Sequence, residues 1–171
     1  VGRRVPGDRP AQATRVATGV CQRTQISSNA MGMGPVGPAS SYNGTDPRTD
    51  LAVLRQQGFR LAVIDTPPAI TMAIQSVISV AELIVVPTRP SPHDLRAVGA
   101  TVDLCERAGK PLLFVVNGAT PKAKITSEAA VALSQHGTVA PITLHHRTDF
   151  AASMIDGRTV MECDPSGRSA Q

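Results

Sequence analysis

The stretch LAVIDTPP, at residues 61–68 of this 171-residue chain, decides the fold. Its four consecutive apolar residues predict a strand that is buried on both faces, as in a parallel sheet covered by helices. Asp65 and Thr66 follow directly, and the two prolines then turn the chain. Because ligands of parallel α/β sheets bind at the carboxyl ends of strands, Asp65 and Thr66 are the first candidate site residues.

Apolar runs and amphipathic segments alternate along the rest of the chain. A helix is predicted from Pro92 to Gly109, with Ser91 as its N-cap. The other predicted strands are 83–86, 112–116 and 139–144, and the other predicted helices are 50–57, 70–80, 126–136 and 149–155. This alternation predicts an α/β domain with a mostly parallel sheet and helices on both faces.

Residues 1–48 differ in composition from the rest of the chain. They are rich in Gly, Pro, Arg, Ser and Thr and have no sustained periodicity. We expect an irregular segment, either disordered or not the native start of the domain, for example one read from a wrong start or frame. The ordered domain is expected over residues 49–171. Residues 16–20 are the one weak strand candidate that precedes it.

Composition excludes several classes of protein. No apolar run approaches twenty residues and no signal-peptide stretch opens the sequence, so we expect a cytoplasmic protein without a membrane span. The formal net charge of +4 comes mostly from the first 50 residues, which carry six Arg against three Asp. The charge is therefore weak evidence for a DNA surface. Cys21, Cys105 and Cys163 lack the spacing of a disulfide or zinc site, and Cys105 is expected to be a buried thiol.

Four segments resemble, in order, motifs of the ParA/MinD-type partition ATPases. These are DTPP at 65–68, VVPTRPSPHDL at 85–95, FVVN at 114–117 and a C-terminal signature made of Ile142, Arg147, Phe150, Ala151, Gly157, Val160 and ECDP at 162–165. The resemblance extends over roughly residues 50–170. It implies a P-loop NTPase-like fold and a role in plasmid or chromosome partitioning.

The resemblance also implies roles for individual residues. Asp65 would order a Mg²⁺ ion, Asn117 would bind the adenine edge of ATP, and residues 144–147 would lie near the base. Intact members dimerise, bind DNA non-specifically and respond to a ParB-like partner. Arg147 and Arg158 are the candidate DNA contacts in this chain. The residues alone leave alternatives open: Asp65 as a turn cap, and the two arginines as members of surface ion pairs.

The sequence departs from the family at the phosphate-binding loop. Members carry K-G-G-x-G-K-T after their first strand, whereas this chain has no Gly-Lys-Thr or Gly-Lys-Ser anywhere and lacks the second motif D-x-D-P-Q. We therefore expect no ATP hydrolysis by the chain as written, which leaves its status as an enzyme open. It is either a truncated partition ATPase or a non-catalytic module that binds DNA or a partner. We also expect an unpaired apolar strand edge where the first strand is missing.

A third interpretation is a phospho-receiver domain. That class also places Asp, Thr and Lys after successive strands, as Asp65, Thr88 and Lys122 do here. The acidic pair that would bind its metal is absent from residues 1–60. The Thr-Pro-Pro that follows Asp65 does not match it either. His145 and His146 are not expected to bind a metal, because no third ligand lies nearby in the sequence.

Overall fold

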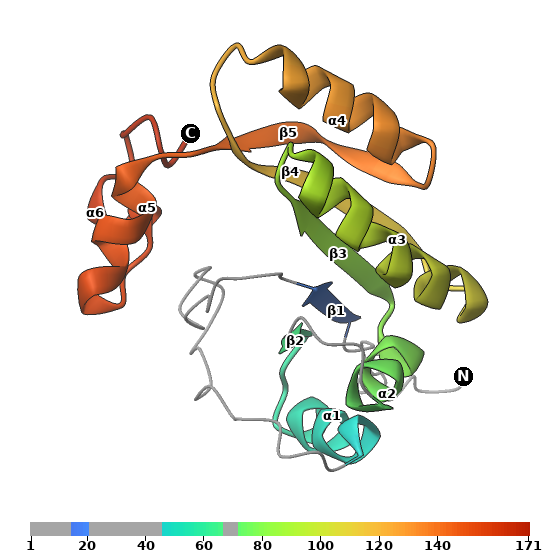
Figure 1. The fold of residues 1–171 in the computed structure, drawn as a ribbon. Helices are drawn as coiled ribbons and strands as arrows, with labels where there is room; N and C mark the ends of the chain where they lie inside the picture. The colour runs from blue at the N-terminus through green and yellow to red at the C-terminus, as the bar shows by residue number, and fades with distance from the viewer. Residues whose placement is uncertain (1–14, 21–45, 67–71) are drawn as a thin grey trace, which may run out of the picture.

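The computed structural model describes residues 15–20, 46–66 and 72–171 (Figure 1). Within these residues all strand pairs are parallel and form one five-stranded sheet in the order β2-β1-β3-β4-β5. The strands are β1 Arg15–Val20, β2 Leu61–Thr66, β3 Leu83–Thr88, β4 Leu112–Ala119 and β5 Thr138–His145. The predicted α/β class with a parallel sheet is thus confirmed.

The helices fall between the strands, as the alternating pattern predicts. They are α1 Pro47–Gln56, α2 Met72–Val80, α3 Pro92–Arg107, α4 Lys124–Ser134, α5 Thr148–Ser153, the 3₁₀ turn η1 Met154–Asp156 and α6 Val160–Cys163. The predicted cap of α3 is confirmed, since the Asp94 backbone N–H donates to Ser91 Oγ at 3.1 Å. Helix α1 begins earlier than predicted because Asp46 caps it and Pro47 occupies its first turn.

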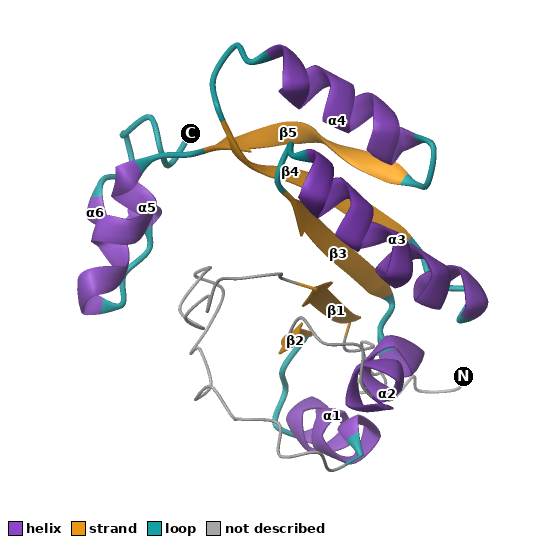
Figure 2. Ribbon diagram, viewed as in Figure 1, coloured by secondary structure: helices purple, strands orange, loops and turns teal. Residues whose placement is uncertain are grey.

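Strand β1 is an interior strand of the sheet, between β2 and β3 (Figure 2). Its register pairs Gly19 with Asp65 on one side and Thr18 with Ile84 on the other. The weakly predicted strand at residues 16–20 is therefore present as β1. The expectation that the sheet lacks its first strand is wrong on this point. The other residues before 46 lie outside the described part of the chain, and the domain boundary at residue 48 stays a prediction.

The hydrophobic core lies against one face of the sheet. Register pairs Val86 with Phe114 and Thr88 with Val116, so these side chains share that face. Helices α2, α3 and α4 cover it, and Figure 1 shows α3 and α4 crossing the sheet on the same side. The core side chains are Ile74, Ile78, Ala81, Ile84, Val86, Val98, Val102, Cys105, Phe114, Val116, Ala119 and Leu133. Burial raises the pKa of the Cys105 thiol to about 11, which confirms the expected buried cysteine.

The opposite face of the sheet is less well covered. Val85 and Val115 are only half-buried, and on β2 Leu61 is 59% and Val63 71% exposed. The prediction that β2 is buried on both faces is therefore wrong. A run of apolar residues fixes the strand, but it does not specify whether other elements cover both of its faces. β2 is also the edge strand of the described sheet.

Two valines on opposite faces test this asymmetry. We expect Val86→Ala, at a side chain 2% exposed, to lower the free energy of unfolding by about 2 kcal/mol, because it empties part of the core. The matched change Val63→Ala, at a side chain 71% exposed, is expected to cost less than about 0.5 kcal/mol. Urea unfolding followed by circular dichroism measures both. Equal losses would mean that the face around Val63 is covered in solution.

Candidate functional site

The strand order creates a switch point between β1 and β3. The chain passes from β1 to β2 in one direction and from β3 through β4 to β5 in the other. In such sheets ligands bind beyond the carboxyl ends of the strands at this point. The described residues at these ends are Asp65 and Thr66, Thr88 and Arg89, Asn117 and Gly118, and His145 and His146. The sequence-predicted residues Asp65, Thr66 and Asn117 thus all lie at the carboxyl edge of one sheet.

Asp65 is an exposed carboxylate at the end of β2, and Thr66 beside it is 6% exposed. Among the described residues no three His, Cys, Asp or Glu side chains gather as a metal cage. Asp65 therefore does not belong to such a group in the described part of the chain. This fits Mg²⁺, which is commonly held by one or two carboxylates together with waters and substrate phosphates. It does not fit a metal site made of protein ligands alone.

The backbone bends where β4 ends. Gly118 has φ +64°, a conformation that side-chain-bearing residues rarely adopt. The register between β4 and β5 shifts at the same place, between Asn117 and Ala119. The His146 N–H donates to the Ala119 carbonyl at 3.0 Å, which keeps the end of β5 close to β4. Irregularities of this kind re-aim side chains next to functional sites, and here the side chain concerned is that of Asn117.

Arg89 crosses the bend from the neighbouring strand end. A Cβ atom built on Gly118 would lie 3.6 Å from both Cγ and Nε of Arg89. The side chain of Arg89 thus lies near Gly118, and because the register pairs Thr88 with Val116, Arg89 and Asn117 follow at neighbouring strand ends. Sequence reasoning did not select Arg89, because only the tertiary contact with Gly118 distinguishes it from any other exposed arginine.

The residues of the phospho-receiver interpretation are arranged differently from what that role needs. Thr88 is 3% exposed and its hydroxyl donates to the Val86 carbonyl of its own strand at 3.3 Å. Lys122 is exposed in the turn after β4, with φ +61°. The strand order itself is shared by several doubly wound families, receivers included, so the order does not separate them. The side chains at the carboxyl edge do separate these families.

Arg147 and Arg158 lie in a different part of the molecule from Asp65. Arg147 is the N-cap residue of α5, beyond the last strand of the sheet, and Asp65 ends β2 at the other side of it. Arg158 donates to Asp156 from Nε at 2.8 Å and from Nη2 at 2.7 Å. That hydrogen bond holds the pKa of Asp156 below its ordinary value and raises the pKa of Arg158. The surface ion-pair alternative therefore describes Arg158.

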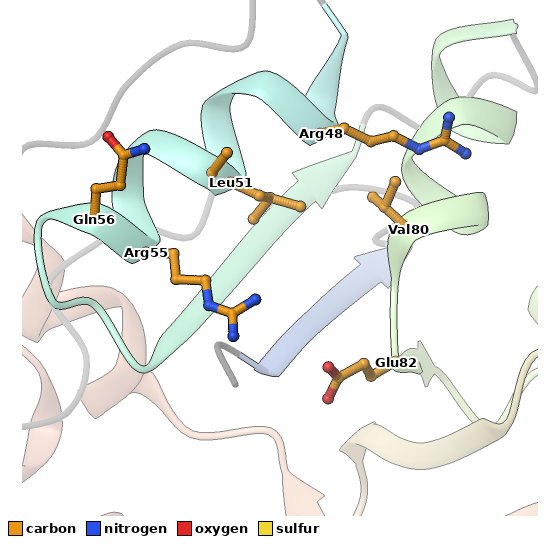
Figure 3. Close-up of a pocket in the computed structure, with 7 residues that line it drawn as sticks. Arg48, Leu51, Arg55, Gln56, Val80 and Glu82 are labelled. Carbon is orange, nitrogen blue, oxygen red and sulfur yellow. The ribbon is translucent and has the colours of Figure 1, made fainter. Parts of the chain in front are cut away.

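One hollow of the described residues lies elsewhere. A cavity of about 590 Å³ opens between α1 and the turn from α2 to β3 (Figure 3). Its lining residues are Arg48, Leu51, Ala52, Arg55, Gln56, Val80 and Glu82. Val80 and Glu82 precede β3, so the cavity is at the amino end of that strand, away from the candidate residues. The chemistry of the carboxyl edge, rather than the size of this hollow, identifies the candidate site.

The described residues have a doubly wound α/β fold that matches the P-loop NTPase-like fold of two solved structures. The "ParA family ATPase" of Chlorobium tepidum superposes with a TM-score of 0.63 over 94% of this chain and 85% of that one, at 15% identity. The "septum site-determining protein MinD complexed with Mg-ADP" of Pyrococcus horikoshii gives 0.62 over 94% and 80%, at 12% identity. At these identities the two structures establish the fold.

Sequence similarity establishes the relationship. The "maintenance of carboxysome distribution protein A" of Halothiobacillus neapolitanus is 30% identical over 140 residues, which is 78% of this chain and 64% of the relative. No family model matches the chain. The chain thus resembles the ParA/MinD-type ATPases in fold, as its motifs predict, and is similar in sequence to this relative, of which it spans less than two thirds. No helix of the described residues is long and apolar enough to cross a membrane.

The Asp156–Arg158 pair has a measurable titration. We expect the carboxyl of Asp156 to titrate below the ordinary aspartate range, and Arg158→Gln to raise its pKa towards the ordinary value. The pKa of Asp156 is lower in the folded state than in the unfolded state. The pair with Arg158 therefore stabilises the fold at pH values above the unfolded-state pKa of Asp156, and this stabilisation is lost as the pH falls through the folded-state pKa. NMR titration of the Asp156 carboxyl carbon measures the shift. Arg147→Gln is the control and should leave it unchanged.

Proposed function

We propose that this chain is part of a ParA-type positioning protein that binds an adenine nucleotide with Mg²⁺ at the carboxyl edge of its sheet. The observation that carries the proposal is the position of Asp65 and Asn117, at strand ends on either side of the β1/β3 switch point. The relationship to ParA/MinD-type ATPases supports it, and so does the fact that the MinD of Pyrococcus horikoshii, which shares the fold, is complexed with Mg-ADP.

Each residue has a distinct task in this proposal. Asp65 would hold the Mg²⁺ ion, and Asn117 would bind the edge of the adenine, because an amide both donates and accepts hydrogen bonds. Thr66 is buried beside Asp65 and stays a candidate ligand contact. When bound, the metal ion would neutralise charge on the phosphate oxygens.

Hydrolysis is not part of the proposal for this chain. The family loop supplies lysines and backbone N–H groups to the phosphates, and no Gly-Lys-Thr or Gly-Lys-Ser is present in the sequence. Removal of a single charge-stabilising donor from a comparable site costs roughly 3–4 kcal/mol of transition-state stabilisation. Absence of the loop therefore leaves binding, and not turnover, as the activity to test.

The class of cargo that we propose is broader than the plasmid or chromosome that the motifs imply. Those motifs imply plasmid or chromosome partitioning, whereas the name of the Halothiobacillus relative refers to carboxysome distribution. We propose the activity that the two have in common, the positioning of a large cellular cargo. A homodimer, non-specific DNA and a ParB-like adaptor are the proposed partners. Arg147 is the stronger proposed DNA contact, because Arg158 is held by Asp156.

The missing loop specifically favours a second candidate function, a ParA-like module that binds DNA or a partner without nucleotide. DNA affinity that falls steeply with salt and is unaffected by ATP would support this candidate. Fluorescence anisotropy of a labelled duplex at several salt concentrations makes that comparison. Arg147→Gln is expected to weaken binding and to reduce the salt dependence by about one phosphate contact.

Calorimetric titration of ATP tests the proposed nucleotide site. We expect Asn117→Ala to weaken binding about tenfold, because a hydrogen bond at the base contributes about 1 kcal/mol or slightly more. Asp65→Asn is expected to remove the dependence of affinity on Mg²⁺. Asp103→Asn makes the same charge change at an exposed position of α3 and should have no effect. No binding at millimolar ATP would reject the proposal in favour of the nucleotide-independent module.

A further inference from the structure

Arg89 has the features of a ligand-contacting residue that the motifs do not assign. It follows β3 at the switch point of the sheet, where the doubly wound architecture places its binding crevice. Atoms Cγ, Cδ and Nε of its side chain lie 3.6–3.9 Å from the position a Gly118 Cβ would occupy. Since the register pairs Thr88 with Val116, Arg89 and Asn117 also follow at neighbouring strand ends.

The guanidinium of Arg89 has no hydrogen bond or ion pair with any described residue, and the residue is exposed. By contrast, Arg158 is bound to Asp156 through two of its nitrogens. Arg89 therefore lies near the end of β4, while its charged, planar end is available to a ligand. A planar cation that is already positioned loses little conformational freedom when a ring packs against it.

Phe, Tyr and Trp side chains are absent from the described strand ends at the carboxyl edge, where His145 and His146 supply the only described aromatic rings. Aromatic residues make up only 2% of the sequence. Phe59 precedes β2, Phe114 is fully buried, and Phe150 belongs to α5. A purine bound beside Asn117 would thus meet no Phe, Tyr or Trp ring at the described strand ends, and His145, on the β5 side of β4, lies against the Ala119 carbonyl. Arginine is the other side chain with a flat face that stacks on aromatic rings.

We infer that Arg89 is the base-stacking residue of the nucleotide site: its guanidinium plane packs against the purine ring whose edge Asn117 binds. The inference rests on the proposed nucleotide function and adds a specificity-determining residue to it. Gly118 has two features that bear on this arrangement. Its positive φ re-aims the chain after Asn117, and the position that a Cβ would occupy is within van der Waals distance of the Arg89 side chain.

Two substitutions and two ligands separate stacking from a phosphate contact. Arg89→Ala removes both charge and plane, whereas Arg89→Lys keeps the charge and removes the plane. Affinity for ATP is measured by calorimetry, and affinity for adenosine, which has no phosphate, by NMR titration of the Gly118 amide. For stacking we expect both variants to lose about fivefold or more in affinity for both ligands. Arg96→Lys, at an exposed position of α3, is the control and should change neither.

Other outcomes overturn the inference in distinguishable ways. If Arg89→Lys keeps the ATP affinity and neither variant affects adenosine, Arg89 contacts phosphate and the stacking role is wrong. If the wild-type chain binds ATP and all Arg89 variants bind it equally, Arg89 does not contact the nucleotide, while the proposed function survives. If the wild-type chain binds neither ligand, both the proposed function and the inference fail. Circular dichroism of each variant confirms that the fold is retained.

Discussion

The pairing of β1 with both β2 and β3 is the interaction on which the rest of the structure depends. Without it, two apolar strands would each expose a row of unpaired backbone N–H and C=O groups. With it, Gly19 is brought level with Asp65 and Thr18 level with Ile84, and one continuous sheet results. The same pairing creates the switch point between β1 and β3, and so determines where a ligand can bind.

The one-sided core follows from how the chain leaves this central strand. From β3 onwards each connection moves in the same direction across the sheet, and right-handed crossovers then bring α3 and α4 to the same face. Phe114 and Val116 are buried there, while Val115 between them is only half-buried. The exposed side chains of Leu61 and Val63 extend this less-covered face to the edge strand.

Most of the architecture could be predicted from local sequence, because the alternation of apolar runs with amphipathic segments and the N-cap residues of helices are local signals. The strand ending at Asp65 and the cap at Ser91 both depend on a few neighbouring residues. Strand β1 gave only a weak signal, since Gly19 and the short run around it disfavour a strand and pairing on both sides overrides that preference. The exposure of Val63 and the contact between Arg89 and Gly118 depend on tertiary arrangement, for which the sequence carries no periodic signal.

The order of the strands alone does not determine the chemistry of this protein. The same order occurs in families with different ligands, and a fold supports whatever function its edge residues allow. Here the edge combines a lone carboxylate suited to Mg²⁺, an amide suited to a base and, beside it, an arginine that pairs with no described residue. No residue of the sequence supplies the lysines of the phosphate loop. The proposed function therefore separates recognition of the base and the metal ion from phosphate transfer, and under it we expect binding to persist where turnover does not.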